Sequence, residues 1–376
     1  MHFREVDLET FAAETQGEIV YASRSSRLNQ KSIIGLNRKP NGDLVSYINP
    51  VMIVAKLPHV VIKGTHSTPF SLQKALYTAR RLTHHDSDPL WHASGWVRKT
   101  DAGIEADLGE IDLHIAEPAF LLCMGNSNFG HFIWEVVARC FMLSRIPEHQ
   151  NLKILYPDTL PQRYLLWLES MGIARDRLIA IPPNSAVHAD LLYVCTAPFA
   201  RSSKRDLIAH EESLHYMRYQ LWRGAAGMGG RTRLFFSRSD AQNKRCVNED
   251  EVRAVLAPYD MTFVTGASTP HETMLEYVRN AELILSPLGA ATAVAAFAPD
   301  DCMVVELTPS PDIFGMFNAA VSALLLGQPF TRVLGQRVEL PDNTAQDKIY
   351  WDYSMEPKQI RIIMESYFLN RSRYEN

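Results

Sequence analysis

Cysteine is scarce in this sequence, and no apolar stretch reaches the roughly 20 residues that a helical bilayer crossing needs. The five cysteines are scattered, and no two of them form a Cys-x-x-Cys pair. This usage argues against a disulfide framework and a thiolate zinc site, and it predicts buried, reduced thiols in a cytoplasmic protein. The N-terminal residues Met1–Glu5 carry a glutamate and no apolar run, so we expect no signal peptide.

Several ligand-binding signatures are missing as well. The sequence contains neither Gly-x-Gly-x-x-Gly nor Gly-x-x-x-x-Gly-Lys-Ser/Thr, so a dinucleotide or P-loop site has no motif behind it. The net charge is −4 and no basic stretch stands out, which argues against nucleic acid as a partner. Arg371, Arg373 and Tyr374 leave peripheral membrane association open, although a solvated helix end is our preferred interpretation.

What is present is an ordinary globular composition, with 46% hydrophobic and 21% charged residues over 376 positions, which predicts two domains. Residues 1–117 are β-rich, with short strands expected over 44–47, 51–54 and 60–62 and one helix expected over Ser71–Leu82, and we assign them to the first domain. From Pro118 onward short apolar strands alternate with helices of about ten residues, a rhythm typical of crossovers in a parallel sheet. The expected strands are 119–124, 152–156, 178–181 and 191–195, with helices over 132–143 and 162–171.

The same rhythm restarts after the glycine-rich segment 224–230, which we interpret as a hinge. Asn248 and Thr269 are expected to cap helices, each with a glutamate three residues later. The strands are expected over 234–237, 261–264, 283–286 and 303–307, with a helix of small residues over 290–297. The predicted domains are therefore 118–223 and 231–330, with the C-terminal segment 331–376 packing back on the first domain.

The predicted strand ends of the second domain carry candidate ligand-binding groups. In a doubly wound sheet, ligands bind at the carboxyl ends of the strands, where loops lead into helix N-termini. The tight turn 287–290 leads into a helix there, and a helix N-terminus suits a diphosphate. Gly289 would allow close backbone approach, and Arg238 and Arg245 could neutralise two phosphates. The alternative is that the basic loop 238–247, which carries both arginines, is only a solvated surface.

In the first domain, His131 and Glu135 lie four residues apart beside a predicted strand end, so they share a helix face. Such a histidine can act as a general base, and the carboxylate can orient it or take the role itself. Alternatively, the histidine only braces the joint between strand and helix. The two side chains could begin a metal site, but no third ligand is evident nearby, so we predict none. The cluster of histidines and aspartates over 84–92 matches no metal-ligand spacing, and a polar loop is the better interpretation.

Together these segments resemble glycosyltransferase family 61. The resemblance covers roughly Pro118 to Pro309, and its parts agree in order and spacing. The first part is an Asn-x-x-His segment with following acidic and basic residues, here Asn128, His131, Glu135 and Arg139. The other parts are Arg233–Arg238 followed by Arg245–Glu249, then Ala281–Ala290, and finally Val304–Leu307.

The resemblance implies two Rossmann-like, doubly wound domains of the GT-B kind facing across a cleft, and an inverting transfer without metal or cofactor. The donor would be a nucleotide-diphospho-sugar, and we expect a UDP-linked one. The acceptor would be a glycan or lipid-linked glycan of a capsular or other surface polysaccharide. His131 or Glu135 would be the base, with Asn128 and Arg139 on the acceptor side. The expected donor-binding residues are Arg238, Arg245, Asn248, Gly289, Ala290 and Glu306, the last through a ribose hydroxyl.

Two positions depart from the family pattern. Leu288 stands where the pattern has histidine, and Val294 stands where it has asparagine. Both departures fall on the expected donor site. They leave open a second hypothesis, in which the chain is a catalytically altered member that serves as a binding or assembly subunit. An epimerase-like enzyme acting on nucleotide-sugars is a weaker third hypothesis, because the dinucleotide fingerprint is missing.

Overall fold

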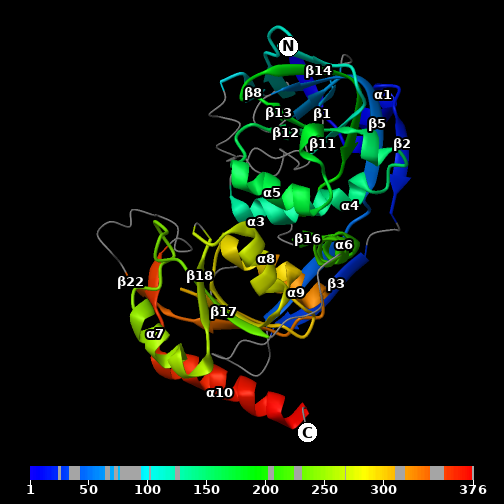
Figure 1. Ribbon diagram of the computed structural model, residues 1–376. Coiled ribbons are helices and arrows are strands. Elements are labelled where there is room, and N and C mark those ends of the chain that lie inside the picture. The colour runs from blue at the N-terminus through cyan, green and yellow to red at the C-terminus, as the bar shows by residue number, and fades with distance from the viewer. Residues whose placement is uncertain are drawn as a thin grey trace. The chain divides into compact units, whose positions relative to one another are not determined.

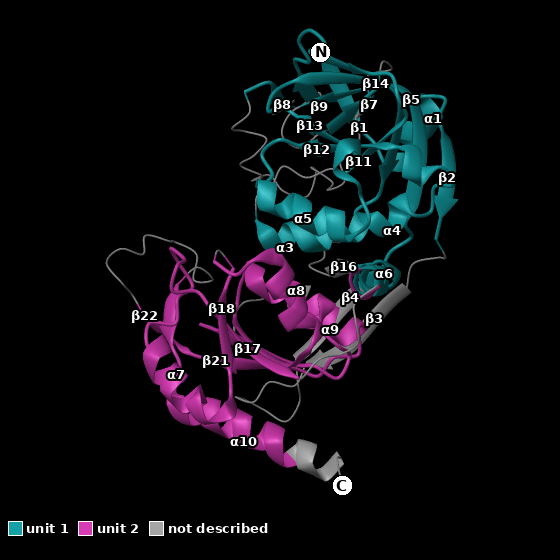
Figure 2. Cartoon of the chain, in the orientation of Figure 1, with its two compact units in different colours: residues 1–29, 47–220 teal, residues 30–46, 221–376 magenta. Residues whose placement is uncertain are grey.

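The structure is a computed structural model, and the chain divides by its contacts into two units (Figure 2). Unit 1 comprises Met1–Asn29 and Tyr47–Gln220, and unit 2 comprises Gln30–Ser46 and Leu221–Asn376. The structure describes residues 1–23, 27–33, 43–63, 68–71, 75–76, 95–100, 103–122, 128–201, 207–223, 231–266, 268–309, 318–338 and 351–374. The cluster over 84–92 and the hinge 224–230 lie outside these ranges, as do residues 125–127 of the polar turn expected over 125–128.

The elements up to residue 222, labelled in Figure 1, belong mostly to unit 1. The first of them are β1 (His2–Glu5), α1 (Leu8–Glu14), β2 (Glu18–Ala22), β3 (Arg27–Ile33), β4 (Asp43–Asn49), β5 (Ile53–Lys63), β6 (Thr68–Phe70), β7 (Ala75–Leu76), β8 (Val97–Thr100), β9 (Gly103–Ala106), β10 (Leu113–Ile115) and β11 (Ala119–Leu121). The others are α3 (Phe129–His131), η2 (Phe132–Val136), η3 (Val137–Arg139), α4 (Cys140–Leu143), η4 (His149–Asn151), β12 (Lys153–Pro157), α5 (Gln162–Ser170), η5 (Arg175–Arg177), β13 (Leu178–Ile181), β14 (Ala186–Cys195), β15 (Phe199–Arg201), β16 (Leu207–Ala209) and α6 (Glu211–Trp222).

The main sheet of unit 1 is mixed. Its order is β13-β12-β11-β14-β5-β6-β7-β1-β9-β8, with β10 on β14 and β2 on β5. The strands β14, β11, β12 and β13 are parallel, as the alternating rhythm predicted. The strand β5, however, pairs antiparallel with β14 along most of its length. The first unit is therefore a mixed α/β structure, and the doubly wound parallel sheet expected for it is wrong beyond β14.

Local predictions in the N-terminal region were weaker. The two short runs expected over 51–54 and 60–62 form one long strand, β5, because its apolar pattern continues through residues that looked like a break. The helix predicted over Ser71–Leu82 is wrong at Ala75–Leu76, which pairs with β1 and β6 as a short strand. Its apolar spacing fits a strand buried by neighbours as well as a helix face.

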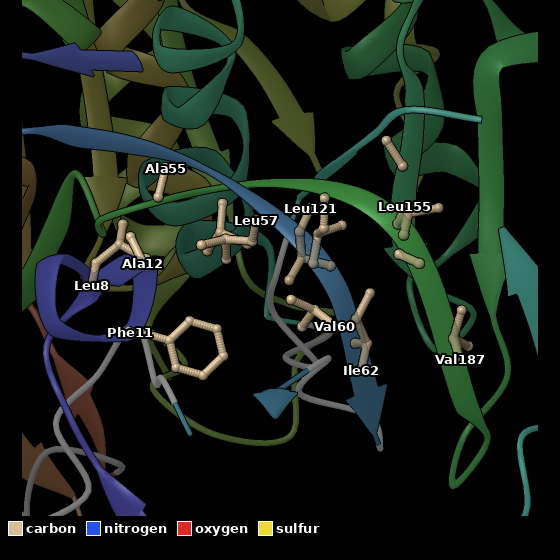
Figure 3. Packing of buried hydrophobic residues seen from close by; sticks show 14 of the residues in the cluster. Leu8, Phe11, Ala12, Ala55, Leu57, Val60, Ile62, Leu121, Leu155 and Val187 are labelled. Carbon is tan, nitrogen blue, oxygen red and sulfur yellow. The ribbon is translucent and has the colours of Figure 1, made fainter. Parts of the chain in front are cut away.

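The core of unit 1 lies between α1 and the face of the sheet that β5, β11, β12 and β14 share. Figure 3 shows Phe11 of α1 near Leu57 and Val60 of β5, with Val187 of β14 on the adjoining strand. These side chains are at most 2% exposed. Because the side chains of a strand alternate between faces, this buried face fixes which residues of β5 and β14 face the other way.

Unit 2 holds the second run of alternating elements (Figure 1). They are β17 (Thr232–Ser237), α7 (Glu249–Leu256), η6 (Ala257–Tyr259), β18 (Thr262–Thr265), α8 (His271–Arg279), β19 (Ala281–Pro287), η7 (Ala290–Phe297), β20 (Met303–Thr308), α9 (Asn318–Leu325), β21 (Phe330–Leu334), β22 (Gln336–Val338), β23 (Asp352–Ser354) and α10 (Pro357–Tyr374). The predicted strands and helices of the second domain are all present within one or two residues, although η7 is a 3₁₀ helix.

The sheet of unit 2 is parallel throughout and has the order β18-β17-β19-β20-β21. The chain winds one way from β17 to β18 and then returns across β17 to β19. The carboxyl ends of β17 and β19 therefore flank a topological switch point, which is where ligands bind in sheets of this kind. Helices cover both faces: α7 and α10 lie on one side, and α8 and α9 lie on the other (Figure 1).

The C-terminal segment belongs to this unit. Ile360, Ile363 and Met364 of α10 join Val252 and Leu256 of α7 in one buried cluster with the sheet. The expectation that residues 331–376 pack on the first domain is therefore wrong for β22, β23 and α10. An amphipathic helix packs wherever an apolar face is uncovered, and the face of β17, β19 and β20 provides one here.

Two predicted helix caps differ in detail. Asn248 is at the N-cap of α7, but its side-chain oxygen accepts from the Met355 backbone N–H at 2.9 Å and makes no bond to the first turn of the helix. Helix α8 begins at His271 with Pro270 at the cap, so Thr269, the predicted cap, lies one position before the observed cap. The Asn248 amide instead bonds the Met355 backbone at both ends, and its Nδ2 also donates to Oε2 of Glu251, the predicted capping-box partner, at 3.0 Å.

No helix within the described ranges combines the length and the apolar character that a membrane crossing needs. The four cysteines that the structure describes, Cys140, Cys195, Cys246 and Cys302, are buried thiols, as the scattered positions predicted. Burial raises the pKa of Cys140 to about 12 and that of Cys246 to about 11. These thiols therefore stay protonated and serve as small apolar side chains.

Candidate active site

Arg238 and Gly289 meet at the switch point of unit 2. Arg238 follows β17 directly and Gly289 follows β19, so the sheet order brings both to the same edge. The guanidinium lies over the glycine: a Cβ added at Gly289 would be 2.5 Å from Nη1 of Arg238. Glycine therefore makes room here for a cationic side chain, whereas the sequence predicted room for a ligand.

The Arg238 side chain is largely withdrawn from water. Its Nη2 donates to the Asn243 backbone carbonyl at 3.1 Å, and its buried Nε has no hydrogen-bond partner within the described ranges. Burial lowers the pKa of Arg238, with Tyr353, Asp240 and Asp352 acting in the opposite direction. A guanidinium stays charged in any protein, so this one is a desolvated cation whose hydrogen-bonding capacity is only partly used.

Tyr353 of β23 lies close enough to Arg238 for the two groups to affect each other electrostatically. It is fully buried, and its hydroxyl also has no partner among the residues described. Burial raises the pKa of Tyr353 well above its usual value, so the hydroxyl remains a neutral donor. Two buried donors with unused capacity thus lie in one region at the carboxyl end of the sheet.

Three residues of the Arg245–Glu249 segment hold the loop after β17 in place. The Arg245 backbone N–H and Nε donate to the two oxygens of Asp352 at 2.7 and 3.0 Å, and that carboxylate is fully buried. Asn248 bonds the backbone of Met355 through both ends of its amide, at 2.8 and 2.9 Å. Each of these predicted donor-binding residues therefore already has a partner within unit 2.

Glu249 continues this network back to the sheet. Its carboxylate accepts from the Ser237 hydroxyl at 2.7 Å and from Nε of Arg253 at 3.0 Å. Because Ser237 is the last residue of β17, the bond fixes the strand end beside Arg238. The Arg-x-x-Asn-Glu pattern is thus explained structurally: it anchors the loop that carries Arg238.

Glu306 of β20 is 1% exposed and lies directly opposite Arg332 of β21 in the parallel register. Nε of Arg332 donates to Glu306 Oε2 at 2.7 Å. Burial raises the pKa of Glu306, and the charges of Arg332 and then Lys244 oppose that rise. The carboxylate predicted to meet a ribose hydroxyl is therefore the acceptor of a buried ion pair.

Lys244 is a further buried cation near this ion pair. It is 5% exposed and has a φ of +57°, a left-handed conformation that lysine rarely adopts. Such strain persists only where the surroundings enforce it, and it concentrates at functional sites. Arg238, Lys244 and Arg332 together place three positive charges at this end of the sheet, with Lys244 buried and the two arginines partly buried.

The turn that carries the two departures from the family pattern is apolar and closely packed. Leu288 is 3% exposed, and its backbone N–H extends the ladder by donating to Leu307 at 2.7 Å. Val294, inside η7, is 2% exposed. Ala290, the first residue of η7, is partly exposed beside Gly289. Both departures are therefore core side chains, whereas Gly289 and Ala290 beside them are partly exposed.

In unit 1, His131 and Glu135 form a hydrogen-bonded pair on the helical segment 129–143. Nδ1 of His131 bonds Oε1 of Glu135. The Glu135 side chain is 5% exposed and that of His131 is 36% exposed. With Glu135 ionised, the bond fixes the tautomer that carries the proton on Nδ1, which leaves Nε2 as the lone-pair nitrogen. The buried carboxylate is thus placed to orient the histidine.

The backbone around this pair is irregular. The segment starts as α3, becomes the π-helical η2, tightens to the 3₁₀ helix η3 and continues as α4. Single π-helical turns inside helices occur frequently at functional sites. Phe132 stacks on Tyr164 of α5 with ring centroids 4.7 Å apart, which holds the irregular turn against its neighbour.

Asn128 and Arg139 lie at the two ends of the irregular stretch. The Asn128 side-chain oxygen accepts from the backbone N–H of Gly130 at 2.9 Å and of His131 at 3.3 Å, so it caps the helix start. Arg139 is 1% exposed, which makes it the largest fully buried side chain in the described structure. Asn128 therefore fixes the start of the segment that carries His131 and Glu135.

The predicted residues therefore form two groups. Asn128, His131, Glu135 and Arg139 lie together in unit 1, and the six predicted donor-binding residues lie in unit 2. Sequence reasoning missed Arg332, Asp352 and Tyr353. Arg332 could have been suspected from strand alternation opposite Glu306. Asp352 and Tyr353 follow the last predicted strand by more than forty residues, and no local pattern ties them to β17.

Comparison with known proteins agrees with one part of the sequence interpretation. Residues 129–305 match the model of the family described as Glycosyltransferase 61. A solved structure with a similar chain is titled "Crystal structure of bacterial iron-containing dodecameric glycosyltransferase TibC from enterotoxigenic E.coli H10407". The similarity has a TM-score of 0.32 at 10% identity and covers 92% of this chain and 99% of that chain, and it carries no further argument. The search of curated proteins found no match. The family match supports a glycosyltransferase.

Proposed function

We propose that the chain is an inverting, metal-independent glycosyltransferase that moves a sugar from a nucleotide-diphospho-sugar to a glycan or lipid-linked glycan acceptor. The observation that carries the donor part is the Arg238 guanidinium over Gly289 at the switch point of unit 2. A desolvated cation with unused hydrogen-bonding capacity favours an anionic partner, and a diphosphate supplies oxygens for it. The buried hydroxyl of Tyr353 is a second donor to the same partner.

This proposal divides the donor-side residues by role. Arg238 and the turn at Gly289 and Ala290 contact the diphosphate. Arg245 and Asn248 act indirectly, because their bonds to Asp352 and Met355 hold the loop of Arg238. Glu306 shapes the site through its pair with Arg332 and leaves any ribose contact to other groups. The charge that stabilises the leaving diphosphate is thereby fixed in place before the reaction, which is how electrostatic catalysis works best.

For the chemical step we propose His131 as the base and Glu135 as the residue that orients it. Nε2 of His131 takes the proton of the acceptor hydroxyl while that oxygen attacks the anomeric carbon. The bond from the anomeric carbon to the diphosphate breaks on the opposite face, and the electron pair leaves on the diphosphate. A single in-line displacement of this kind inverts the configuration. The greater exposure of His131 favours it over the buried Glu135 as the base.

The biological setting belongs to the same proposal. The family resemblance favours a role in capsular or other surface polysaccharide synthesis and a UDP-linked donor. The buried, reduced cysteines favour a cytoplasmic location. Work at the inner face of the membrane would give access to a lipid-linked acceptor. No nucleic acid partner is expected at a net charge of −4.

The first test is a thermal-shift panel of UDP, GDP, CMP and related nucleotides. A ligand at about a hundred times its dissociation constant adds roughly 2.7 kcal/mol to stability, which is a shift of several degrees. Arg238→Gln should abolish the shift, whereas Arg361→Gln, an exposed position on α10, should keep it. A shift that survives in Arg238→Gln would place the nucleotide elsewhere and sink the proposed donor site.

The second test measures transfer itself. Once a nucleotide is identified, its sugar conjugates are assayed for nucleotide release with and without a chelator, and the product anomer is read by proton NMR. Continued turnover in the chelator with the opposite anomeric configuration is the expected result. Retained configuration would refute the single displacement.

A second candidate function is that of a binding or assembly subunit in a polysaccharide-making complex. The specific observation in its favour is Leu288, a buried side chain where the family pattern has histidine. On this reading the chain binds no nucleotide, or binds one without turnover. Nucleotide binding that depends on Arg238 but never yields transfer, across the full donor panel, would move the assignment to this alternative.

A further inference from the structure

A cluster of three histidines and one aspartate lies in unit 1, on strands that carry none of the residues proposed for sugar transfer. His188 and Asp190 belong to β14, His114 to β10 and His59 to β5. His114 is the register partner of His188 across the β10–β14 pair. His59 lies opposite Asp190, since its chain neighbours Pro58 and Val60 pair with the neighbours of Asp190. Side chains at paired positions share a face, so all four residues face the same way.

The opposite face of these strands is core. Val60 and Val187 (Figure 3), together with Ala189, alternate with the histidine cluster and are fully buried in the hydrophobic core of unit 1. The four polar residues therefore stand on a rigid, buried scaffold with their side chains toward solvent. A ligand set on strands of this kind is held more accurately than one on loops.

The potential ligand atoms are close together. Nδ1 of His188 is 3.5 Å from Oδ1 of Asp190, and Nδ1 of His59 is 3.9 Å from the same oxygen. One ligand atom from each of these three residues lies within 4.8 Å of the other two. In a tetrahedral site with bonds of about 2.0–2.1 Å, ligand atoms are roughly 3.3–3.4 Å apart. The three residues need only small side-chain movements to reach that spacing.

We propose that His59, His188 and Asp190 bind a divalent transition-metal ion with the ligand preferences of zinc. Two imidazoles and one carboxylate are ligands that Zn²⁺ accepts, and nitrogen ligands select against Mg²⁺ and Ca²⁺. The three protein ligands leave one position of a tetrahedral ion for water on the solvent side. The site joins β5 to β14, two strands whose pairing is made by residues far apart in the sequence.

His114 has a supporting role in this site. Its Nε2 is 2.7 Å from Oδ1 of Asp190, which has a second lone pair available for the ion. A carboxylate ligand that is hydrogen-bonded from outside the coordination sphere is typical of metal sites, since the bond fixes its orientation. His114 is therefore a positioning residue, and its loss should weaken binding less than the loss of a ligand.

The site differs from the two groups of residues proposed for sugar transfer, and its metal is no part of that reaction. A chelator should therefore remove the ion and lower the melting temperature of the protein without stopping turnover at a temperature where the protein is folded. This also keeps the tests of the two proposals separate, because metal binding is measured on the chain without donor or acceptor.

The experiment titrates tag-free, metal-stripped protein with Zn²⁺ by calorimetry and counts bound metal by mass spectrometry after gel filtration. The expected result is one ion per chain, no comparable binding of Mg²⁺, and a cobalt(II) spectrum with the intense visible bands of four-coordination. His188→Asn and Asp190→Asn should each lower affinity at least a hundredfold. His59→Asn should do the same, and asparagine tolerates the left-handed backbone at this position, where φ is +49°.

The controls separate a built site from scattered surface histidines. His215→Asn, an exposed position on α6, should leave stoichiometry and affinity unchanged. His114→Gln should weaken binding about tenfold to a hundredfold with the stoichiometry kept. Circular dichroism of each variant checks that the variant is folded. Zinc binding that is equal in His188→Asn and His215→Asn, or absent from the wild-type chain, would overturn the proposal.

Discussion

The buried pair of Glu306 and Arg332 makes the sharpest prediction about unit 2. Arg332 is 10% exposed at its side chain and Glu306 is 1% exposed. Arg332→Met keeps most of the side-chain volume and removes the charge, which leaves a buried carboxylate without its main partner. Breaking a buried pair in this way costs about 3–5 kcal/mol. We expect the lower end, about 3 kcal/mol, because Lys244 also acts on Glu306.

The loss of folding stability in Arg332→Met should depend on pH. Burial raises the pKa of Glu306, and the charge of Arg332 opposes that rise. Without Arg332, the folded carboxyl should hold its proton to a higher pH than the unfolded one does. The folded state then binds more protons, so stability falls as pH rises. Arg332→Met should therefore be closer to wild type at pH 5 than at pH 8.

Urea unfolding followed by circular dichroism at pH 5 and pH 8 measures both effects. The double variant Glu306→Gln with Arg332→Met removes both charges and should recover most of the lost stability, since replacing a buried pair by uncharged groups is often neutral. A loss below about 1 kcal/mol in Arg332→Met, or an equal loss at both pH values, would refute this account of a buried ion pair. Glu306 would then be available for the ribose contact that the family resemblance implied.

Three further predictions test the proposed site. Gly289→Ala adds a Cβ that would lie 2.5 Å from Nη1 of Arg238, so it should displace the guanidinium and weaken nucleotide binding in calorimetry. Because the backbone at Gly289 is extended, the melting temperature of the free protein should stay nearly unchanged. Glu135→Gln should lower the transfer rate by about 10²–10⁴ in a nucleotide-release assay while donor affinity is kept, because His131 loses the charged carboxylate that orients it and stabilises its protonated form. An unchanged rate would exclude that role. Asp352→Asn should lower the free energy of unfolding by about 3–5 kcal/mol in urea, because the fully buried side chain loses the charge that holds Arg245 and the loop after β17. A loss below about 1 kcal/mol would contradict this.

The second unit was largely predictable because its signals are local. Each strand of its parallel sheet is a short apolar run, and each helix carries an apolar face within a few turns. The parallel direction followed from alternation alone, and the position of the candidate donor site followed from the rule that ligands bind at strand ends. Arg238 and Gly289 were therefore named correctly as neighbours at one edge, although the sequence did not predict that the arginine would occupy the space beside the glycine.

The first unit was less predictable because its long strands pair across large distances in the chain. The strand β5 finds its partner β14 some 130 residues later, and no periodic pattern records such a pairing. The cost of closing such a loop grows only slowly with its length, so local sequence contains little information about the partner. The histidine cluster was missed for this reason, since its members come from three strands that meet only in the folded sheet.

The sequence by itself thus determined the alternation of strands and helices, the parallel sheet of unit 2 and the residue types at its strand ends. Only the tertiary structure decided which of those residues are already engaged. Glu306 is bound by Arg332 because the register of β20 and β21 places them opposite each other. Arg245 is bound by Asp352 because β23 returns to the loop after β17. Register is set by which faces can be buried together, and that is a property of the assembled core.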